Sequence, residues 1–299
     1  MASSTQGLSE GAFALIDVLG FKGIWRRVSH VNEIVDKLKR VEKYRADIVE
    51  KKIGAAANLR LLSLSDSIVI CAHFQEPDSQ KQLPNRGTLV NLVCISVREL
   101  IREFAEGAIP MSIRGCVSYG QFHVEDNFIL GPAVDEAAAF HAVPQGAFVW
   151  LTPSAARPIV EFNEWLNSEM GQHLCEAAGT ILLSGTLKST WETVQDSQKK
   201  KVIAAIAKPI GKLVCESGVI RTKMPIKGGD IIDTLVVNPL GKNPGETKTI
   251  IDGMLASMDA DSIDVLAKRY NTERFLHEML KQYDERYEQM AALIRNAKP

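Results

Sequence analysis

The sequence predicts an α+β fold: a sheet with a βαββαβ-like order of elements, followed by a helical insertion and a helical C-terminal tail. Short apolar runs typical of strands alternate with segments of helical spacing over residues 12–151, and two longer helical stretches follow. The chain has 299 residues, of which 45% are apolar and 24% charged. These values are ordinary for a soluble globular protein and allow a sizeable core.

The first predicted elements are a buried strand, a helix and a hairpin. A strand is predicted over residues 12–19 because they are almost all apolar, and the glycines of GFKG, residues 20–23, allow a tight turn after it. Residues 29–52 have the pattern of a helix. Residues 59–74 are apolar on both sides of a short polar SDS, which predicts a hairpin with Asp66 at its bend.

The next elements complete the predicted core. Apolar residues recur at helical spacing over 89–104, and Gly107 and Pro110 then end that helix. The elements after it are predicted from strand patterns, from turn residues and from a proline at the start of the second helix. They are a strand over 111–122, a hairpin arm over 128–131, a helix over 132–142 and a strand over 146–151.

The second half of the chain is predicted to be mainly helical. Residues 154–212 follow a helical pattern with one turn-like interruption, LLSGTLKS, at 182–189. Residues 224–240 predict two more strands joined at KGGD. The glycines and proline of LGKNPGETK, residues 240–248, indicate a linker.

The last segment carries apolar residues at alternating steps of four and three, a seam shorter than a coiled coil usually needs. Docking on the protein's own body and self-association both fit this seam, and docking is the preferred interpretation. We therefore expect one domain over residues 10–245, with a helical insertion at about 154–218, and a C-terminal helical extension over 246–299 that packs on it. The seam residues are Leu276, Leu280, Tyr283, Tyr287, Met290 and Ile294.

Charge and cysteine content restrict the class of protein. The formal net charge of −1 argues against broad binding to nucleic acid or to anionic lipid, so any phosphate site must be small. The five cysteines form no CxxC motif, which fits a reducing cytoplasm. The N-terminus has no signal-peptide pattern and no apolar stretch reaches spanning length, so we expect a cytoplasmic protein without a membrane segment.

Two carboxylates in apolar surroundings are the candidate chemical centre. Asp17 lies within FALIDVLGF and Asp66 within SLSDSIVI. A buried carboxylate requires a compensating partner, and two of them repel each other. If adjacent strands bring them together, one or two Mg²⁺ or Mn²⁺ ions would neutralise the pair. The alternative is that Asp17 caps a helix and Asp66 makes a hairpin turn, and spacing alone leaves both interpretations open.

A third charge in an apolar strand favours the metal interpretation. Arg114 lies within SIRGCV, and its guanidinium is suited to phosphate oxygens. The backbone N–H groups of the GFKG turn could bind the same oxygens. Together with the two carboxylates, these groups describe a triphosphate site.

Three separated motifs resemble the class III nucleotidyl cyclases: IDVLGF, SLSDSIVI, and IRGCVSYG before ILGPAVDEA. The resemblance covers roughly residues 12–150 and implies a cyclase-like fold with a ferredoxin-like βαββαβ core. It assigns two Mn²⁺ or Mg²⁺ ions to Asp17, Val18 and Asp66. It also implies phosphate binding by Arg114 and by the turn at Gly20, Phe21 and Lys22, and a homodimer with two shared sites.

The chain departs from the family at the base-recognition positions. Leu62 and Phe128 stand where adenylate and guanylate cyclases carry polar residues, so neither purine code is present. The positions of the transition-state asparagine and arginine hold Asp135 and Ala139. This departure supports an alternative, a cyclase-fold binding or dimerisation module without catalysis. The retained aspartates and Arg114 favour the enzyme.

Several motifs look most like the pyrimidine cyclases of bacterial Pycsar anti-phage systems: the IRG strand, the GPAVDEA helix start and the PIKGG turn. This resemblance implies cyclic UMP from UTP, or alternatively cyclic CMP from CTP, and a separate effector that responds to the product.

The remaining polar residues have simpler interpretations. Lys227 in PIKGG either belongs only to a tight hairpin or serves as the phosphate-binding lysine of a late family hairpin. Lys199–Lys201 fit a solvated helix face. His73, His123 and His141 show no ligand spacing and are interpreted as ordinary surface or core residues.

Overall fold

The structure is a computed structural model of the chain. It describes residues 7–19, 21, 28, 32–37, 39–40, 57–64, 66–74, 85–107, 109–125, 128–186, 207, 218–240, 244–258 and 262–296. Gly20, Lys22, Lys199–Lys201, most of the helix predicted over 29–52 and the residues between 187 and 206 lie outside the described residues.

One mixed sheet forms the centre of the molecule. Its strands follow the order β2-β3-β1-β4-β6-β8-β7, and the short β5 pairs with β4 beyond this path. β1 is antiparallel to β3 on one side and to β4 on the other, whereas β4 and β6 are parallel. The strands are β1 (Ser9–Leu19), β2 (Ala57–Leu64), β3 (Ser67–Phe74), β4 (Ser112–Glu125), β5 (Phe128–Leu130), β6 (Val149–Leu151), β7 (Val219–Pro225) and β8 (Ile231–Val237).

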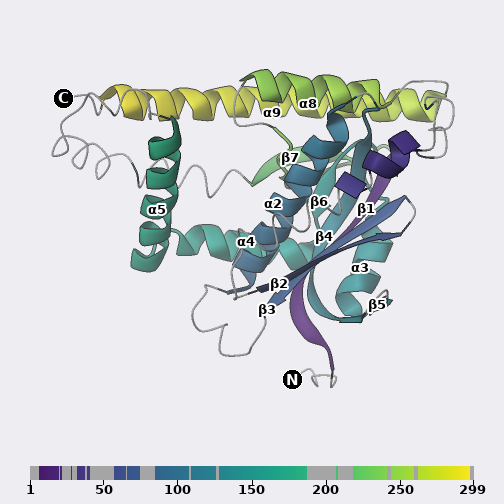
Figure 1. The fold of residues 1–299 in the computed structure, drawn as a ribbon, viewed down its shortest axis with the longest axis horizontal. Coiled ribbons are helices and arrows are strands. Elements are labelled where there is room, and N and C mark those ends of the chain that lie inside the picture. Colours follow the sequence, from purple (N-terminus) through teal and green to yellow (C-terminus); the bar gives the residue numbers. More distant parts are fainter. Residues whose placement is uncertain are drawn as a thin grey trace.

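Helices cover the sheet, so the predicted α+β class is confirmed. Figure 1 shows α2 and α3 on either side of β1 and β4, with the long α9 crossing one edge of the molecule beside α8. α3 covers the β4 face that carries Cys116 and Ser118, whose side chains donate to the carbonyls of Ala137 and Ala133. The helices are α2 (Asn85–Ala105), α3 (Pro132–Phe140), α4 (Pro153–Trp165), α5 (Glu169–Thr186), α8 (Pro244–Ala256) and α9 (Ile263–Asn296).

The predicted helix interruption and linker are placed differently in the structure. α5 continues through Leu182–Thr186, the first part of the predicted interruption at 182–189, whose remaining residues lie outside the described residues, and a break between helices that was not predicted falls at residues 166–168. Ser168 explains that position, because its hydroxyl accepts a hydrogen bond from the Gly171 N–H and so caps α5.

The predicted linker over 240–248 is also wrong in its second half, because α8 begins at Pro244. Proline is favoured at the first helical position, where no backbone N–H is required, so the same residue that indicated a linker starts a helix. Two strand boundaries differ as well: β7 begins at Val219, not at residue 224, and β6 begins at Val149, not at residue 146.

The first half of α9 packs on the core. Its residues Phe275, Leu276 and Met279 are buried, and the Phe275 ring lies edge-on to Phe148 with the ring centroids 4.5 Å apart.

In the part of the chain that the structure describes, no helix combines the length and apolar character needed to cross a membrane.

A buried lysine secures the C-terminal end of α2. The Lys37 ammonium donates to the carbonyl oxygens of Phe104, Glu106 and Ile109 at 2.6 to 2.7 Å. Carbonyls at a helix end lack intrahelical partners, and a cation there is favourable. Burial lowers the pKa of Lys37 to about 8, so the side chain still carries its charge at neutral pH.

We expect Lys37→Met to destabilise the protein by about 2–4 kcal/mol, because three buried carbonyls lose their donor. Urea unfolding of the variant, compared with the wild type, measures this change. Lys39→Met is the matched control, since Lys39 is exposed on the same helical segment. Equal stabilities of the two variants would show that Lys37 does not anchor α2.

Candidate active site

Asp17 lies near the end of the central strand and has two side-chain partners. The Ser67 hydroxyl donates to Asp17 Oδ1 at 2.9 Å, and His141 Nε2 lies 3.2 Å from Asp17 Oδ2. The Asp17 side chain keeps 22% of its surface exposed. The carboxylate is therefore partly compensated and open on one side, as a ligand-binding carboxylate must be.

Asp66 lies beside Asp17 at the same end of the sheet. It occupies the turn between β2 and β3 and is exposed. Its carbonyl oxygen accepts a hydrogen bond from the Val18 N–H at 2.9 Å, and the next residue, Ser67, pairs with Asp17 across the β1–β3 ladder. Among the described residues, no group of three or more His, Cys, Asp or Glu side chains is arranged to hold a metal ion.

Arg114 lies on β4, the other strand paired with β1, directly opposite Asp17. Residues opposite each other in an antiparallel pair point to the same face, so both side chains share one face of the sheet. Arg114 is half-buried, and its Nε and Nη1 atoms are buried without a hydrogen-bond partner among the described residues. An unsatisfied buried N–H costs about 1–3 kcal/mol, so these atoms are placed to receive acceptors from a ligand.

The charges of Lys227 and Arg114 both contribute to the pKa of one carboxyl group, that of Asp264. The pKa of Asp264, in the first turn of α9, lies below its usual range because Lys268 donates a hydrogen bond to it and because the charges of Lys268, Arg114 and Lys227 stabilise its ionised form. Arg114 and Lys227 are far apart in the sequence, yet both act on Asp264. Both cations therefore contribute to the electrostatic surroundings of the first turn of α9.

The segment after α3 connects these groups. The Lys227 N–H donates to the Val143 carbonyl, and Asn271 of α9 donates to the Gln145 carbonyl at 2.8 Å. The Gly115 N–H, next to Arg114, donates to the Phe148 carbonyl at 2.9 Å. Residues 143–148 thus tie β4, the β7–β8 hairpin and α9 together around the cations.

The hairpin that carries Lys227 has the predicted tight turn. Gly228 and Gly229 both have positive φ, 101° and 92°, which glycine adopts without strain. Lys227 itself is exposed. Its side chain is free to reach a ligand while its backbone is fixed.

The two predicted base-recognition residues lie far apart within the chain. Leu62 is half-buried. It pairs with Val69 of β3, which pairs with Leu15 of β1, which in turn pairs with Cys116 of β4, so this row across the sheet lies on the same face as Asp17. Phe128 pairs with Glu125 on the β4–β5 arm and is 74% exposed. Cys116 and Glu125 are nine positions apart on β4, about 30 Å along an extended strand.

The other predicted positions are less informative. Phe21 is partly buried against the main core, whereas its predicted partners in phosphate binding, Gly20 and Lys22, lie outside the described residues. Asp135 and Ala139 lie exposed on the surface of α3, whose buried face carries Ala133 and Ala137.

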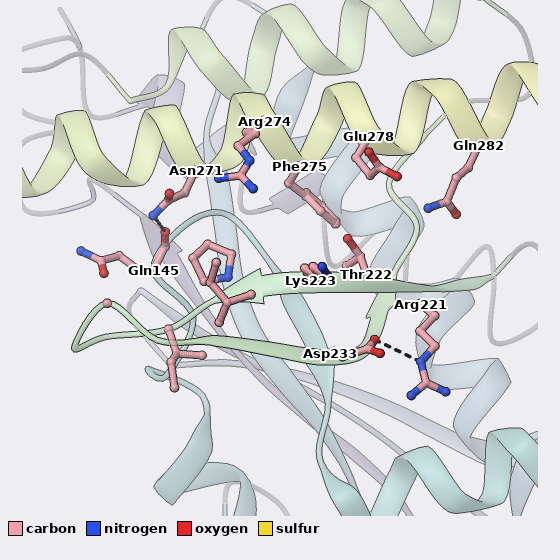
Figure 2. Close-up of a pocket in the computed structure, with 14 residues that line it drawn as sticks. Gln145, Arg221, Thr222, Lys223, Asp233, Asn271, Arg274, Phe275, Glu278 and Gln282 are labelled. Atoms are coloured by element: carbon pink, nitrogen blue, oxygen red, sulfur yellow. Dashed lines mark hydrogen bonds and ion pairs between the residues drawn. The ribbon is translucent and has the colours of Figure 1, made fainter.

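A cleft of about 660 Å³ lies between the β7–β8 hairpin and α9. Figure 2 shows Arg274, Phe275 and Glu278 of α9 on one side, and the ion pair of Arg221 with Asp233, whose N–O distance is 3.0 Å, on the other. Its lining contains none of Asp17, Asp66 and Arg114 and carries charges of both signs. We therefore place the candidate site at the carboxylates and not in this cleft.

Sequence reasoning missed His141 as a member of the site. The histidine follows α3, and the sequence offers no ligand spacing between it and Asp17. The only local signal is its place at the end of a helix that begins next to the predicted sheet. Its contact with Asp17 depends on how α3 packs on β1 and β4, which no short-range pattern specifies.

No protein-family model matches the chain, and no curated protein matches it. Among solved structures, the chain is similar to the catalytic core of a rhodopsin-guanylyl cyclase with converted specificity in complex with ATPαS. The identity is 14% and the TM-score 0.39, over 51% of this chain and 81% of that one.

The chain is also similar to a class III adenylyl cyclase-like ATP-binding protein from Pseudomonas aeruginosa, with 14% identity and a TM-score of 0.36, over 53% of this chain and 38% of that one. A bacterial light-regulated adenylyl cyclase gives 12% identity and a TM-score of 0.38, over 84% and 59%. The chain spans less than two thirds of the length of these two proteins.

We expect Arg114→Met to leave the free energy of unfolding unchanged or to raise it by about 1 kcal/mol, because it removes buried N–H groups that lack partners. Inorganic triphosphate should raise the melting temperature of the wild type but not of this variant. Thermal unfolding with and without the anion measures both effects, and Arg60→Met, at an exposed position on β2, is the control. A loss of more than about 2 kcal/mol in Arg114→Met would instead indicate a structural role.

Proposed function

We propose that the protein is a nucleotidyl cyclase that converts a nucleoside triphosphate into a 3′,5′-cyclic nucleotide and pyrophosphate. The observation that carries the proposal is the Arg114 guanidinium, which has buried N–H groups without a partner among the described residues and lies on the same face as Asp17, whose neighbour Val18 contacts the turn of Asp66. A cation with free donors next to two carboxylates suits a metal-bound phosphate chain. The motif resemblance leads to the same reaction.

Each side chain has a defined part in this reaction. Asp17 and Asp66 would hold Mn²⁺ or Mg²⁺, and the Val18 backbone lies next to both. Such ions supply Lewis acidity, which makes the ribose 3′-hydroxyl a better nucleophile and neutralises charge at the phosphates. Arg114 binds oxygens of the phosphate chain and stabilises the leaving pyrophosphate, and Lys227 adds a second positive charge. The residues mainly position the substrate and compensate its charge.

The arrangement of the base-recognition residues favours a homodimer. Leu62 shares a face with Asp17, whereas Phe128 is exposed on the far part of the β4–β5 arm. Phe128 can therefore reach a base pocket only if that pocket belongs to a second copy of the chain. The resemblance to family members with shared sites supports the same arrangement.

We further propose a pyrimidine substrate, with UTP preferred over CTP. Leu62 and Phe128 offer no polar group to pair with the edge of adenine or guanine, and an unpaired polar edge costs about 1–3 kcal/mol. The preference for UTP, the anti-phage role and a separate effector that responds to cyclic UMP rest on the resemblance to the Pycsar cyclases.

The enzymatic proposal predicts pyrophosphate release from the wild type with Mn²⁺. Asp17→Asn and Asp66→Ala should lower kcat at least about a thousandfold, because loss of a metal ligand removes several kcal/mol of transition-state stabilisation. Asp252→Asn, which alters an exposed carboxylate on α8, should keep wild-type turnover. Near wild-type activity in either site variant, with the same metal dependence, would overturn the assignment.

The substrate proposal predicts that UTP dominates when the four ribonucleoside triphosphates compete at equal concentration. Chromatography of the cyclic products measures the preference, and the purine products should be at least about tenfold lower. Dominant cyclic AMP or cyclic GMP would contradict the pyrimidine proposal, whereas dominant cyclic CMP would correct only its last step. Triphosphate binding without turnover would identify a binding module instead.

A further inference from the structure

The ring of His141 has a defined orientation. Its Nδ1 atom lies 2.8 Å from the carbonyl oxygen of Ala138, near the end of α3. A carbonyl only accepts hydrogen bonds, so Nδ1 carries the hydrogen and donates it. In the neutral ring, Nε2 then has a lone pair, and this atom lies 3.2 Å from Asp17 Oδ2.

Two lone pairs that face each other at this distance repel, so the contact requires either a proton on Nε2, which makes an ion pair with Asp17, or a metal ion between the two atoms. Neighbouring ligands of an octahedral ion, each about 2.1 Å from the metal, are about 3.0 Å apart. The 3.2 Å between His141 Nε2 and Asp17 Oδ2 is close to that separation. An Nδ1–H donated to a backbone carbonyl is also the usual support of a histidine that binds a metal through Nε2.

The same chain contains a useful comparison, His123. Its Nδ1 lies 3.0 Å from the Gly7 carbonyl oxygen and its Nε2 lies 3.3 Å from Glu125 Oε2. That pair stands on the exposed β4–β5 arm, where the Glu125 side chain is 76% exposed and water surrounds it. Asp17 and His141 are 22% and 25% exposed, Arg114 is opposite Asp17 in the β1–β4 ladder, and the Asp66 carbonyl accepts a hydrogen bond from the N–H of Val18, next to Asp17.

We propose that His141 is a ligand of a divalent metal ion that it shares with Asp17. The inference rests on the proposed function, because substrate phosphate oxygens would complete the coordination of a site with so few side-chain ligands. Asp66 then serves the second ion. An imidazole nitrogen suits transition-metal ions better than Mg²⁺, which prefers oxygen ligands, and Mn²⁺ is the transition-metal ion that also accepts the carboxylate and phosphate oxygens of such a site. The chain should therefore bind Mn²⁺ in preference to Mg²⁺.

The test is Mn²⁺ binding by the full chain, followed by electron paramagnetic resonance with and without a non-hydrolysable UTP analogue. His141→Ala should weaken Mn²⁺ binding at least about tenfold, as loss of a ligand does, and should weaken Mg²⁺ binding less. His123→Ala is the matched control and should bind Mn²⁺ like the wild type. Thermal unfolding of each variant shows that it is folded.

A second variant separates a ligand from an ion-pair partner. His141→Asp supplies a new oxygen ligand, so it should restore Mn²⁺ binding and strengthen Mg²⁺ binding relative to His141→Ala. If His141 only forms an ion pair with Asp17, His141→Ala already binds Mn²⁺ at least as well as the wild type, so there is no loss for His141→Asp to restore.

Three results would overturn the inference: Mn²⁺ affinity of His141→Ala within about twofold of the wild type, no rescue by His141→Asp, or no Mn²⁺ binding by the wild type with or without the analogue. Different results decide the proposed function. A chain that binds Mn²⁺ through His141 but releases no pyrophosphate has the metal site without the reaction, and an active chain with unchanged binding in His141→Ala has the reaction without this ligand.

Discussion

The double pairing of β1 is the constraint on which the candidate site depends. β1 is hydrogen-bonded to β3 on one side and to β4 on the other, and Asp17 is opposite Ser67 in one ladder and Arg114 in the other. A shift of one residue in either register would turn a partner to the opposite face of the sheet. The apolar residues around Asp17 oppose such a shift, because Ala14 and Ile16 are fully buried. The core packing therefore also fixes the spacing of the charges.

Two buried atoms of the Arg114 guanidinium, Nε and Nη1, lack hydrogen-bond partners in the part of the chain that the structure describes. The charges of Arg114 and Lys227 help to keep the pKa of Asp264 on α9 below its usual range. α9 reaches this position because Thr272 accepts a hydrogen bond from the Ala147 N–H and because Phe275 packs on Phe148. The C-terminal helix therefore packs on the segment whose Phe148 carbonyl accepts a hydrogen bond from the N–H of Gly115, next to Arg114, although the motifs of the sequence lie in the first half of the chain.

The individual strands follow from local patterns in the sequence, whereas the closeness of Asp17 and Asp66 depends on the pairing of β1 with β3, which the sequence offered only as a condition. The apolar strand over 12–19 and the hairpin that bends at Asp66 lie where the pattern places them, because apolar runs and turn residues act over short distances. Pro244 was harder to interpret, since proline both ends structure and begins helices. The contacts of Lys37 with the end of α2 and of His141 with Asp17 could not be predicted, because they join segments that come together only when the helices pack.

The most direct test of the account is the position of a bound nucleotide and its metal. A crystal structure with Mn²⁺ and a non-hydrolysable UTP analogue would show the ion through its anomalous scattering. We predict an anomalous peak within coordination distance of Asp17 Oδ2 and phosphate oxygens hydrogen-bonded to Nε and Nη1 of Arg114. A nucleotide bound instead in the cleft between the β7–β8 hairpin and α9, with the Arg114 N–H groups still unpaired, would contradict the account.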